Sequence, residues 1–320
     1  MSEISLYSFA KINLSIDVGK PMENGMHPVD MVMQQLAFHD DVKVSYAPDR
    51  KLDRGEFRIT LSTNRPYLPT DERNLAYKAA VLMGEKFGKS VPGGNIHIDI
   101  RKRIPVAAGM AGGSGNAAAV LHGLNVLWGG KDGLVGLDRI LAAGSELGSD
   151  VPFCAAGQAR GCRGLPAALR NDPAGGCCAR ATGTGTDLKI IKGLRSWVVI
   201  AKPRLSVSTA EVYKGIDSCD IKERPDNDIL EKALEDGDRR TAEGQMINVL
   251  ESYTLKAYPQ VAELKEAVIR AESGRSARRV LMSGSGPTVF ALFDTLNQAK
   301  KLCADVRSMG YEAYWTKTTV

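Results

Sequence analysis

The stretch RIPVAAGMAGGSGNAAAV, residues 103–120, joins a glycine-rich loop to a helix-forming run. Glycine and alanine crowd its first half, whereas NAAAVLHGLNVLW, residues 116–128, consists mostly of good helix formers. Such a loop before a helix is typical of an anion site, because missing side chains let backbone N–H groups approach a phosphate. The helix N-terminus adds unpaired donors and roughly half a positive charge. The loop alone is equally compatible with a flexible linker or a close helix-packing seam.

Two common phosphate-binding motifs are excluded. The chain has no G-x-x-x-x-G-K-[ST] sequence, and no G-x-G-x-x-G follows a first strand with an acidic residue about 20 positions later. A P-loop nucleoside triphosphatase and a dinucleotide-binding domain are therefore not expected. The function of the loop has to be inferred from the rest of the chain.

Composition narrows the class of protein. The net charge of +5 over 320 residues is a mild bias that suits an anionic small molecule. The densest basic cluster is the short RKR at 101–103, so we expect no nucleic-acid binding. We also expect a cytoplasmic protein without a membrane span, because the chain shows no signal segment and no apolar run of about 18 residues. The six cysteines lack the C-x₂-C spacing of zinc sites, which favours reduced thiols.

The first half of the chain alternates between strand and helix patterns. Residues 4–18 alternate between apolar and mainly polar positions, with Ser8 as the only break on the apolar face, which predicts a long half-buried strand. Further along we expect a loop at 23–28, short strands near 41–46 and 56–61, a helix at 74–88, a strand at 95–101, and helices at 116–128 and 137–148, the last closed by SDVPFC.

The second half begins with a buried strand at 196–203 that ends at Pro203. Ser208 or Thr209 is expected to cap the next helix. Helices near 227–237, 244–257, 259–273 and 295–309 and strands within 278–293 and 311–317 complete the pattern. This mixture predicts an α+β protein rather than a doubly wound sheet. Residues 155–180 show no periodicity, and we expect an irregular insertion or linker there.

Four stretches together resemble the GHMP kinases, the galactokinase, homoserine, mevalonate and phosphomevalonate kinase superfamily. The quoted loop resembles the family's P-x-x-x-G-L-G-S-S-A-A phosphate loop. The others follow in the expected order: FAKINLSIDV (9–18), LGSDVPFC (147–154) and MSGSGPTVFALF (282–293). Within the family, the similarity points to the isoprenoid-pathway members, and it covers the chain nearly end to end apart from 155–180.

The resemblance implies a fold and a domain division. It predicts the two-domain α+β GHMP kinase fold, with an N-terminal domain like the second domain of ribosomal protein S5 and a ferredoxin-like C-terminal domain. We place the N-terminal domain at 1–154 and the C-terminal domain at 181–320, with 155–180 between them.

The resemblance also implies an activity. It predicts ATP-dependent phosphorylation of the 2-hydroxyl of 4-diphosphocytidyl-2-C-methyl-D-erythritol, with ATP and Mg²⁺ as cofactors. Asp150 matches the catalytic aspartate that takes the hydroxyl proton, and Lys11 matches the lysine beside it. A cation there would favour the charged carboxylate and a more acidic attacking hydroxyl. The bland alternatives are a solvated strand lysine and an aspartate that merely starts the next element.

The resemblance assigns the phosphate contacts to the loop. The expected nucleotide-binding residues are Pro105, Gly109, Ala111, Gly112, Gly113, Ser114 and Gly115. Gly115 and Asn116 stand where the family usually has serine and either asparagine or aspartate. The missing hydroxyl removes one possible contact, although the backbone donors remain. The sequence does not identify the magnesium ligands, and Ser114 is only a candidate.

The expected substrate-binding residues are Asn13, Met26, His27, Gly284, Ser285 and Gly286. In the resembling enzymes a Gly-Tyr-His segment holds the cytosine base, and this chain departs from it by carrying Met26 in place of the tyrosine. A thioether contacts an aromatic base for about 0.3–1.5 kcal/mol, whereas stacking on a ring contributes about 1–3 kcal/mol. We therefore expect cytidine binding to be weaker by up to roughly tenfold. The turn at 284–286 is equally compatible with an ordinary hairpin.

Two other functions stay open at this point. The altered base-binding segment is compatible with another small-molecule kinase of the same family. The unexplained segment 155–180 directly follows Asp150 and is compatible with a catalytically silent ligand-binding relative. We expect a small-molecule substrate and a monomer or weak homodimer.

Overall fold

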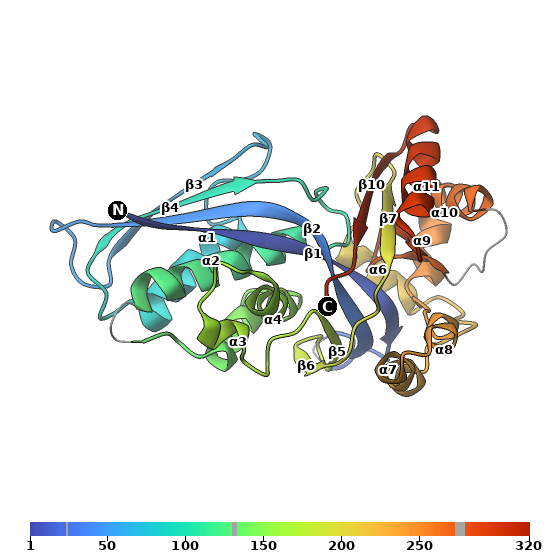
Figure 1. Cartoon of the computed structure of the whole chain (residues 1–320), viewed down its shortest axis with the longest axis horizontal. Helices are drawn as coiled ribbons and strands as arrows, with labels where there is room; N and C mark the ends of the chain where they lie inside the picture. The colour runs from blue at the N-terminus through green and yellow to red at the C-terminus, as the bar shows by residue number, and fades with distance from the viewer. Residues whose placement is uncertain (24, 130–132, 273–278) are drawn as a thin grey trace. The chain divides into compact units, whose positions relative to one another are not determined.

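The computed structural model describes residues 1–320 except 24, 130–132 and 273–278. The chain folds into two compact units (Figure 1). The first comprises 1–10, 38–105 and 111–177, and the second comprises 11–37, 106–110 and 178–320. Strands β1 (Ser2–Val18) and β2 (Val29–Pro48) pair with each other, and each contributes residues to both units.

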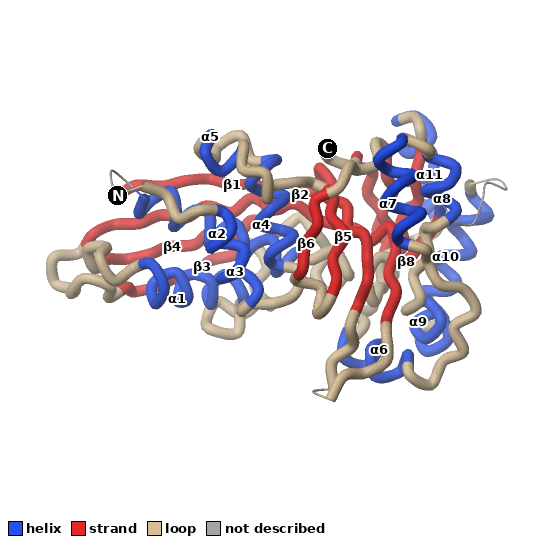
Figure 2. The backbone as a smooth tube through the Cα atoms, turned by 90° about the horizontal axis from the view of Figure 1, so that it is seen from below, coloured by secondary structure: helices blue, strands red, loops and turns tan. Residues whose placement is uncertain are grey.

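The first unit is a sheet with helices on one face (Figures 1 and 2). Strand β4 (Gly94–Arg101) pairs in parallel with β3 (Phe57–Thr63) and antiparallel with β2. Along β4 every second residue is buried, which gives the sheet one covered and one open face. The helices are α1 (Leu75–Phe87), α2 (Gly112–Gly129), α3 (Leu137–Ser145), α4 (Val151–Gly161) and the short α5 (Ala167–Arg170).

The second unit contains an antiparallel sheet in the order β10-β7-β9-β8. These strands are β7 (Trp197–Lys202), β8 (Val280–Met282), β9 (Val289–Phe293) and β10 (Glu312–Lys317). Helices α6 (Thr209–Ile216), α7 (Asn227–Asp236), α8 (Arg239–Gly244), α9 (Glu251–Ala257) and α10 (Pro259–Ala271) precede β8, and α11 (Leu296–Ser308) precedes β10. Helices after the first strand and before the last strand give the ferredoxin-like arrangement that was expected. Strands β5 (Cys178–Thr182) and β6 (Asp187–Ile190) extend from the first half of β2.

Two helices with clear N-caps, α1 and α6, confirm the helices predicted there. Asn74 caps α1 by accepting from the Ala76 N–H, and Ser208 caps α6 by accepting from the Glu211 N–H. The helix expected over 259–273 is α10, and residue 273 lies outside the described residues. Of the expected loop at 23–28, residue 24 also lies outside them. No helix among the described residues is long and apolar enough to cross a membrane.

Several predictions in the first half were wrong. Strand β1 is buried on both faces over residues 8–16, so its polar side chains are not solvated. Strand β2 begins at Val29, well before the predicted 41–46. The prediction missed its first half because Gln34 and Gln35, which are buried, interrupt the apolar pattern of the sequence. SDVPFC does not close a helix, since Val151 begins α4.

Two further predictions were wrong. The helix expected over 244–257 is instead the last residue of α8, a connecting segment and α9. The segment 155–180 is not irregular, because it contains most of α4, all of α5 and the start of β5. Its alanines Ala155, Ala156 and Ala159 are fully buried, so small residues rather than bulky ones make this packing surface. The domain boundaries themselves stay a prediction.

Candidate active site

The loop before α2 has a strained backbone. Ala107, Gly109 and Ala111 have positive φ angles of 50°, 68° and 54°. The left-handed conformation costs a residue with a Cβ about 1–2 kcal/mol, so two alanines hold it against their own preference. Strain of this kind persists where the surrounding structure enforces it, and it concentrates at functional sites.

The loop delivers the chain into α2 with open backbone donors. The Gly115 N–H donates to the Ala111 carbonyl at 2.8 Å, and the preceding N–H groups are those that every helix leaves without intrahelical partners. Gly113 is exposed and Ser114 is half-buried. A Cβ on Gly113 would meet only Leu75 Cδ1, at 3.7 Å, so the approach to this turn is open. These predicted nucleotide-binding residues therefore stand at an accessible helix start, a position whose N–H groups favour anions in general.

A buried polar network lies directly beneath this helix start, all within the first unit. The Lys102 Nζ donates to the Asp40 carboxylate and, at 2.9 Å, to Asn116 Oδ1. The Asn116 Nδ2 donates to Asp40 Oδ2 at 3.0 Å and to Ser8 Oγ at 2.9 Å. Asp40 is fully buried, and its Oδ1 also accepts the N–H groups of Arg103 and Ile104 at 2.6 and 2.8 Å. The network thus fixes the chain on both sides of the loop.

This network explains two glycines and was missed by sequence reasoning. A Cβ on Gly112 would lie 3.1 Å from Lys102 Nζ, and one on Gly115 would lie 2.6 Å from Ser8 Oγ. The hydroxyl of Ser8 therefore fills the space in which a side chain at 115 would begin. The signal in the sequence was weak, because Lys102 stood out only as part of a basic cluster and Asp40 only as one of two adjacent aspartates.

Asp150 stands at the N-cap position of α4 in the first unit. Its backbone is helical (φ −82°, ψ −13°), and its side chain makes no capping hydrogen bond to the helix. The residue is half-buried. The Asp150 carboxylate therefore does not cap the N-terminus of α4, as an N-cap aspartate commonly does.

Lys11 and Asn13 are brought together in the second unit. Two residues apart on β1, they share a face of the strand, and Lys11 Nζ donates to Asn13 Oδ1 at 2.7 Å. Lys11 is 5% exposed and Asn13 fully buried. A buried ammonium needs such partners, so the solvated-face alternative for Lys11 does not hold.

The stretch MSGSGPTVFALF (282–293), here called the third glycine-rich motif, packs against the phosphate loop within the second unit. Ser283 Oγ donates to the Gly109 carbonyl at 2.9 Å. A Cβ on Gly109 would collide with the Ser283 carbonyl and would lie 2.9 Å from that of Gly286. Gly284 and Gly286 have positive φ angles of 59° and 87°. The predicted residues 284–286 therefore adjoin the predicted phosphate-loop residue Gly109.

The expected base-binding residues differ in burial. His27 is buried, and its Nε2 lies 2.8 Å from Asp217 Oδ1. The ring of Tyr213 lies 5.9 Å from the His27 ring, centroid to centroid. Met26 is 49% exposed. Sequence reasoning missed Asp217 and Tyr213, because they come from α6 and its C-cap, about 190 residues further along the chain.

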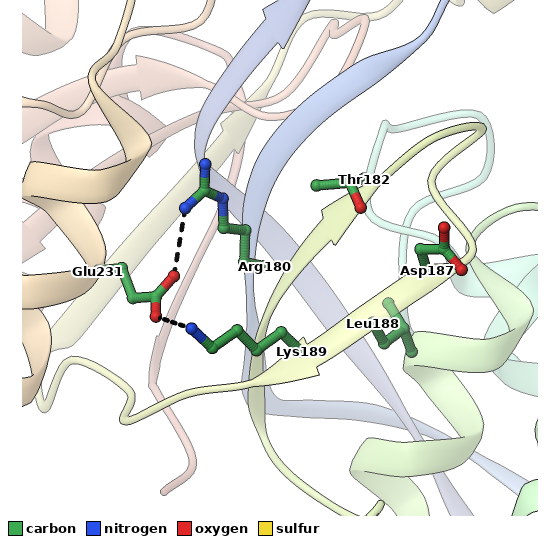
Figure 3. Close-up of a pocket in the computed structure, with 6 residues that line it drawn as sticks. All are labelled: Arg180, Thr182, Asp187, Leu188, Lys189 and Glu231. Carbon is green, nitrogen blue, oxygen red and sulfur yellow. Dashed lines mark hydrogen bonds and ion pairs between the residues drawn. The ribbon is translucent and has the colours of Figure 1, made fainter.

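A separate cavity of about 460 Å³ in the second unit contains none of the predicted site residues (Figure 3). Its lining includes Arg180, Lys189 and Glu231. Glu231 accepts from Lys189 Nζ at 2.5 Å and from Arg180 at 3.3 Å. Arg180 also binds Asp30 at 2.7 Å. Both cations therefore already have carboxylate partners, and this cavity is not the candidate active site.

Two protein-family models match this chain. A family model described as "GHMP kinases N terminal domain" matches residues 74–158, and one described as "GHMP kinases C terminal" matches residues 223–312. The chain belongs to the GHMP kinase family, and as a member it is an ATP-dependent kinase of small molecules. The family resemblance and the two-domain α+β fold expected from the sequence are confirmed.

Individual relatives are similar over nearly the whole chain. It is 41% identical to the 4-diphosphocytidyl-2-C-methyl-D-erythritol kinase of Alkaliphilus metalliredigens, over 94% of this chain and 91% of the relative. It is 40% identical to the enzyme of that name from Clostridioides difficile, over 93% and 90%. A crystal structure of 4-(cytidine 5'-diphospho)-2C-methyl-D-erythritol kinase superposes with a TM-score of 0.72 at 28% identity, covering 99% of this chain and 100% of the other. The homoserine kinase of Cytophaga hutchinsonii shares the fold at 18% identity, with a TM-score of 0.69 over 100% and 95% of the two chains.

Proposed function

We propose that this chain transfers the γ-phosphoryl group of ATP to the 2-hydroxyl of 4-diphosphocytidyl-2-C-methyl-D-erythritol, a step in isoprenoid precursor synthesis. The observation that carries the phosphoryl-transfer part is the strained loop 105–111 that leads into the open N-terminus of α2. The substrate is supported by the names of the relatives, which match over more than nine-tenths of the chain.

The reaction is assigned to two side chains. Asp150 takes the proton of the attacking hydroxyl, and Lys11 supplies positive charge to the developing alkoxide. Asn13 holds the Lys11 ammonium through its 2.7 Å hydrogen bond, which restricts the rotamers of a long side chain. The remaining requirement is positioning, because phosphoryl transfer needs the attacking and leaving oxygens in line.

The phosphates are assigned to the loop and the first turn of α2. The backbone N–H groups of Gly112, Gly113 and Ser114 would bind phosphate oxygens, with Pro105, Gly109, Ala111 and Gly115 shaping the loop. These donors lie at a helix N-terminus, where a negative charge is favoured. The missing serine hydroxyl at position 115 leaves this backbone set intact.

Mg²⁺ fits the donor chemistry of the first unit. Ser114 and Asp150 offer hard oxygen atoms, and neither side chain is fully buried. Mg²⁺ commonly takes only one or two protein oxygens and completes its shell with phosphate and water. Among the described residues, no group of three acidic, histidine or cysteine side chains could hold a metal ion. When bound, the ion neutralises charge on the phosphates.

The cytidine end is assigned to His27 and Met26, and the methylerythritol end to Asn13 and residues 284–286. Asp217 orients the His27 ring through the 2.8 Å contact at Nε2, and we assign the contact with the base to the other ring nitrogen. Met26 is exposed and gives the base a thioether instead of an aromatic ring. This substitution is the specific argument for a second candidate, a GHMP kinase acting on a different alcohol.

A substrate panel separates these candidates. ADP release with ATP and Mg²⁺ is measured with 4-diphosphocytidyl-2-C-methyl-D-erythritol, mevalonate, homoserine and galactose, each at the same concentration. We expect turnover only with the cytidine compound. Faster turnover with another alcohol would refute the proposed substrate while leaving the kinase chemistry intact. The enzyme is expected to act as a monomer or weak homodimer, which sedimentation at assay concentration tests.

A further inference from the structure

The stretch NVLE, residues 248–251, was given no role by the sequence motifs, yet its side chains bind the third glycine-rich motif. Asn248 is 3% exposed. Its Nδ2 donates to the carbonyls of Met282 and Gly284, each at 2.8 Å. Its Oδ1 accepts the Leu250 N–H at 3.0 Å. Both amide hydrogens and the amide oxygen are therefore used.

Two neighbouring side chains bind the same backbone. Glu251 Oε1 accepts the Met282 N–H at 2.8 Å, and its Oε2 pairs with Lys265 at 2.5 Å. Thr254, which is fully buried, donates to the Ser285 carbonyl at 3.3 Å. The beginning of α9 thus holds the backbone from 282 to 285 by side-chain hydrogen bonds.

Asn248 is itself fixed by β1, the strand that carries Lys11 and Asn13. The Ile16 N–H donates to the Ile247 carbonyl at 2.9 Å, and the Val249 N–H donates to the Ile16 carbonyl at 3.1 Å. Beyond the turn, Ser283 Oγ holds the Gly109 carbonyl at 2.9 Å. A continuous set of hydrogen bonds within the second unit therefore links β1, Asn248, the glycine turn and the phosphate loop.

We propose that Asn248 is a positioning residue for phosphoryl transfer, which fixes the 283–286 turn and, through Ser283, the Gly109 end of the phosphate loop. This inference rests on the proposed function. The turn needs this support because Gly284 and Gly286 have positive φ angles and no side chain of their own to hold them. An amide suits the position because two carbonyls and one N–H converge there, which requires two donors and one acceptor.

Two variants distinguish a role in the glycine turn from a role limited to the backbone before α9. Asn248→Asp keeps the shape and the acceptor for the Leu250 N–H but loses both donors to the turn. Asn248→Ala loses all three contacts. If Asn248 acts through the turn, the aspartate variant is at least as impaired as the alanine variant, because its carboxylate faces two carbonyl oxygens. If Asn248 only fixes the backbone before α9 through the Leu250 N–H, the aspartate variant retains activity.

Asn227→Ala is the matched control for loss of a buried amide in the same unit. Asn227 is 5% exposed, donates to the Asp30 carbonyl at 2.8 Å and accepts from Ser15 Oγ at 2.6 Å, without touching the turn. Thermal unfolding is measured first, and turnover is then compared at a temperature at which each variant is fully folded. We expect kcat to fall about 10- to 100-fold in both Asn248 variants, since small misplacements in an active site have effects of this size. Asn227→Ala should stay within about threefold of the parent.

Equal kcat in Asn248→Ala and Asn227→Ala, or full activity in Asn248→Asp, would overturn the proposal. Amide hydrogen exchange gives a readout independent of the substrate. The proposal predicts lost protection at 283–286 and at 109–110 in the Asn248 variants alone, and unchanged protection there would also overturn it. An inactive parent protein would instead refute the proposed substrate, and the exchange result would still decide the role of Asn248.

Discussion

Replacing Lys102 by methionine tests the network beneath the phosphate loop. Methionine has a similar length and removes the cation, so Asp40 would be left buried with only neutral donors. The Lys102 side chain is 6% exposed and that of Asp40 is fully buried, so solvent does little to screen the loss. Breaking a buried ion pair by removing one partner costs about 3–5 kcal/mol. We expect the free energy of unfolding to fall by about that amount.

The structure also specifies how the loss is relieved. Asp40→Asn retains an oxygen for the N–H groups of Arg103 and Ile104, while it removes the uncompensated charge. The double variant Lys102→Met/Asp40→Asn should therefore be more stable than Lys102→Met alone by more than about 1 kcal/mol. Coupling of this size is expected of residues that share one network.

Urea unfolding followed by circular dichroism measures all four corners of this double-mutant cycle. A loss below about 1 kcal/mol in Lys102→Met, or a double variant less stable than Lys102→Met alone, would refute the reasoning. Either result would mean that the ion pair is solvated in the protein, contrary to its burial. The affinity for ATP, measured for the parent and all three variants at a temperature where each is folded, shows whether the network also shapes the phosphate loop.

Three other perturbations have defined outcomes. Burial lowers the pKa of His122 to about 4, so its imidazole stays neutral in the folded protein, whereas the unfolded chain takes up a proton near pH 6.5. The contribution of His122 to the free energy of unfolding is therefore complete above pH 6.5 and falls by up to about 1.4 kcal/mol per pH unit between 6.5 and 4. The difference in unfolding between the parent and His122→Gln, measured against pH, should isolate this dependence. Gly109→Ala combines a positive φ of 68° with a collision at the Ser283 carbonyl, and it should reduce kcat/KM at least tenfold in the ADP-release assay, whereas unchanged kcat/KM would show that the loop relaxes freely. Met26→Tyr should lower the KM for the cytidine substrate by up to roughly tenfold through base stacking, and no gain would mean that the base does not contact residue 26.

Local signals in the sequence predicted the capped helices and the alternating strand β4. Capping residues such as Asn74 and Ser208 stand directly before periodic runs, and the alternation of β4 is unbroken. The segment 155–180 could not be predicted in this way, because α4 packs through alanines that pattern rules treat as neutral. The early start of β2 was hidden by Gln34 and Gln35, which are both buried. Gln34 bonds distant backbone groups, and Gln35 donates to the Thr319 hydroxyl.

The residues of the candidate site likewise fall into those that the sequence predicted and those that only the structure shows. Motif similarity pointed to Lys11, Asp150 and the loop, since these residues stand in short ordered stretches. The residues that support them are scattered: Asp40 reaches Lys102 across 62 positions, and Asn248 reaches Gly284 across 36. A single chain without its fold gives no sign of such pairings, because buried polar partners are chosen by proximity in space. The structure was needed to find the supporting residues.

The most direct test of the central claim is ADP release by the parent protein and by Asp150→Asn with ATP, Mg²⁺ and 4-diphosphocytidyl-2-C-methyl-D-erythritol. The asparagine keeps the shape of the side chain but cannot take up the hydroxyl proton. The account predicts turnover in the parent and its loss in the variant, with ATP binding retained in both. Turnover that survives in Asp150→Asn, or a parent that binds ATP without turning over this substrate, would contradict it.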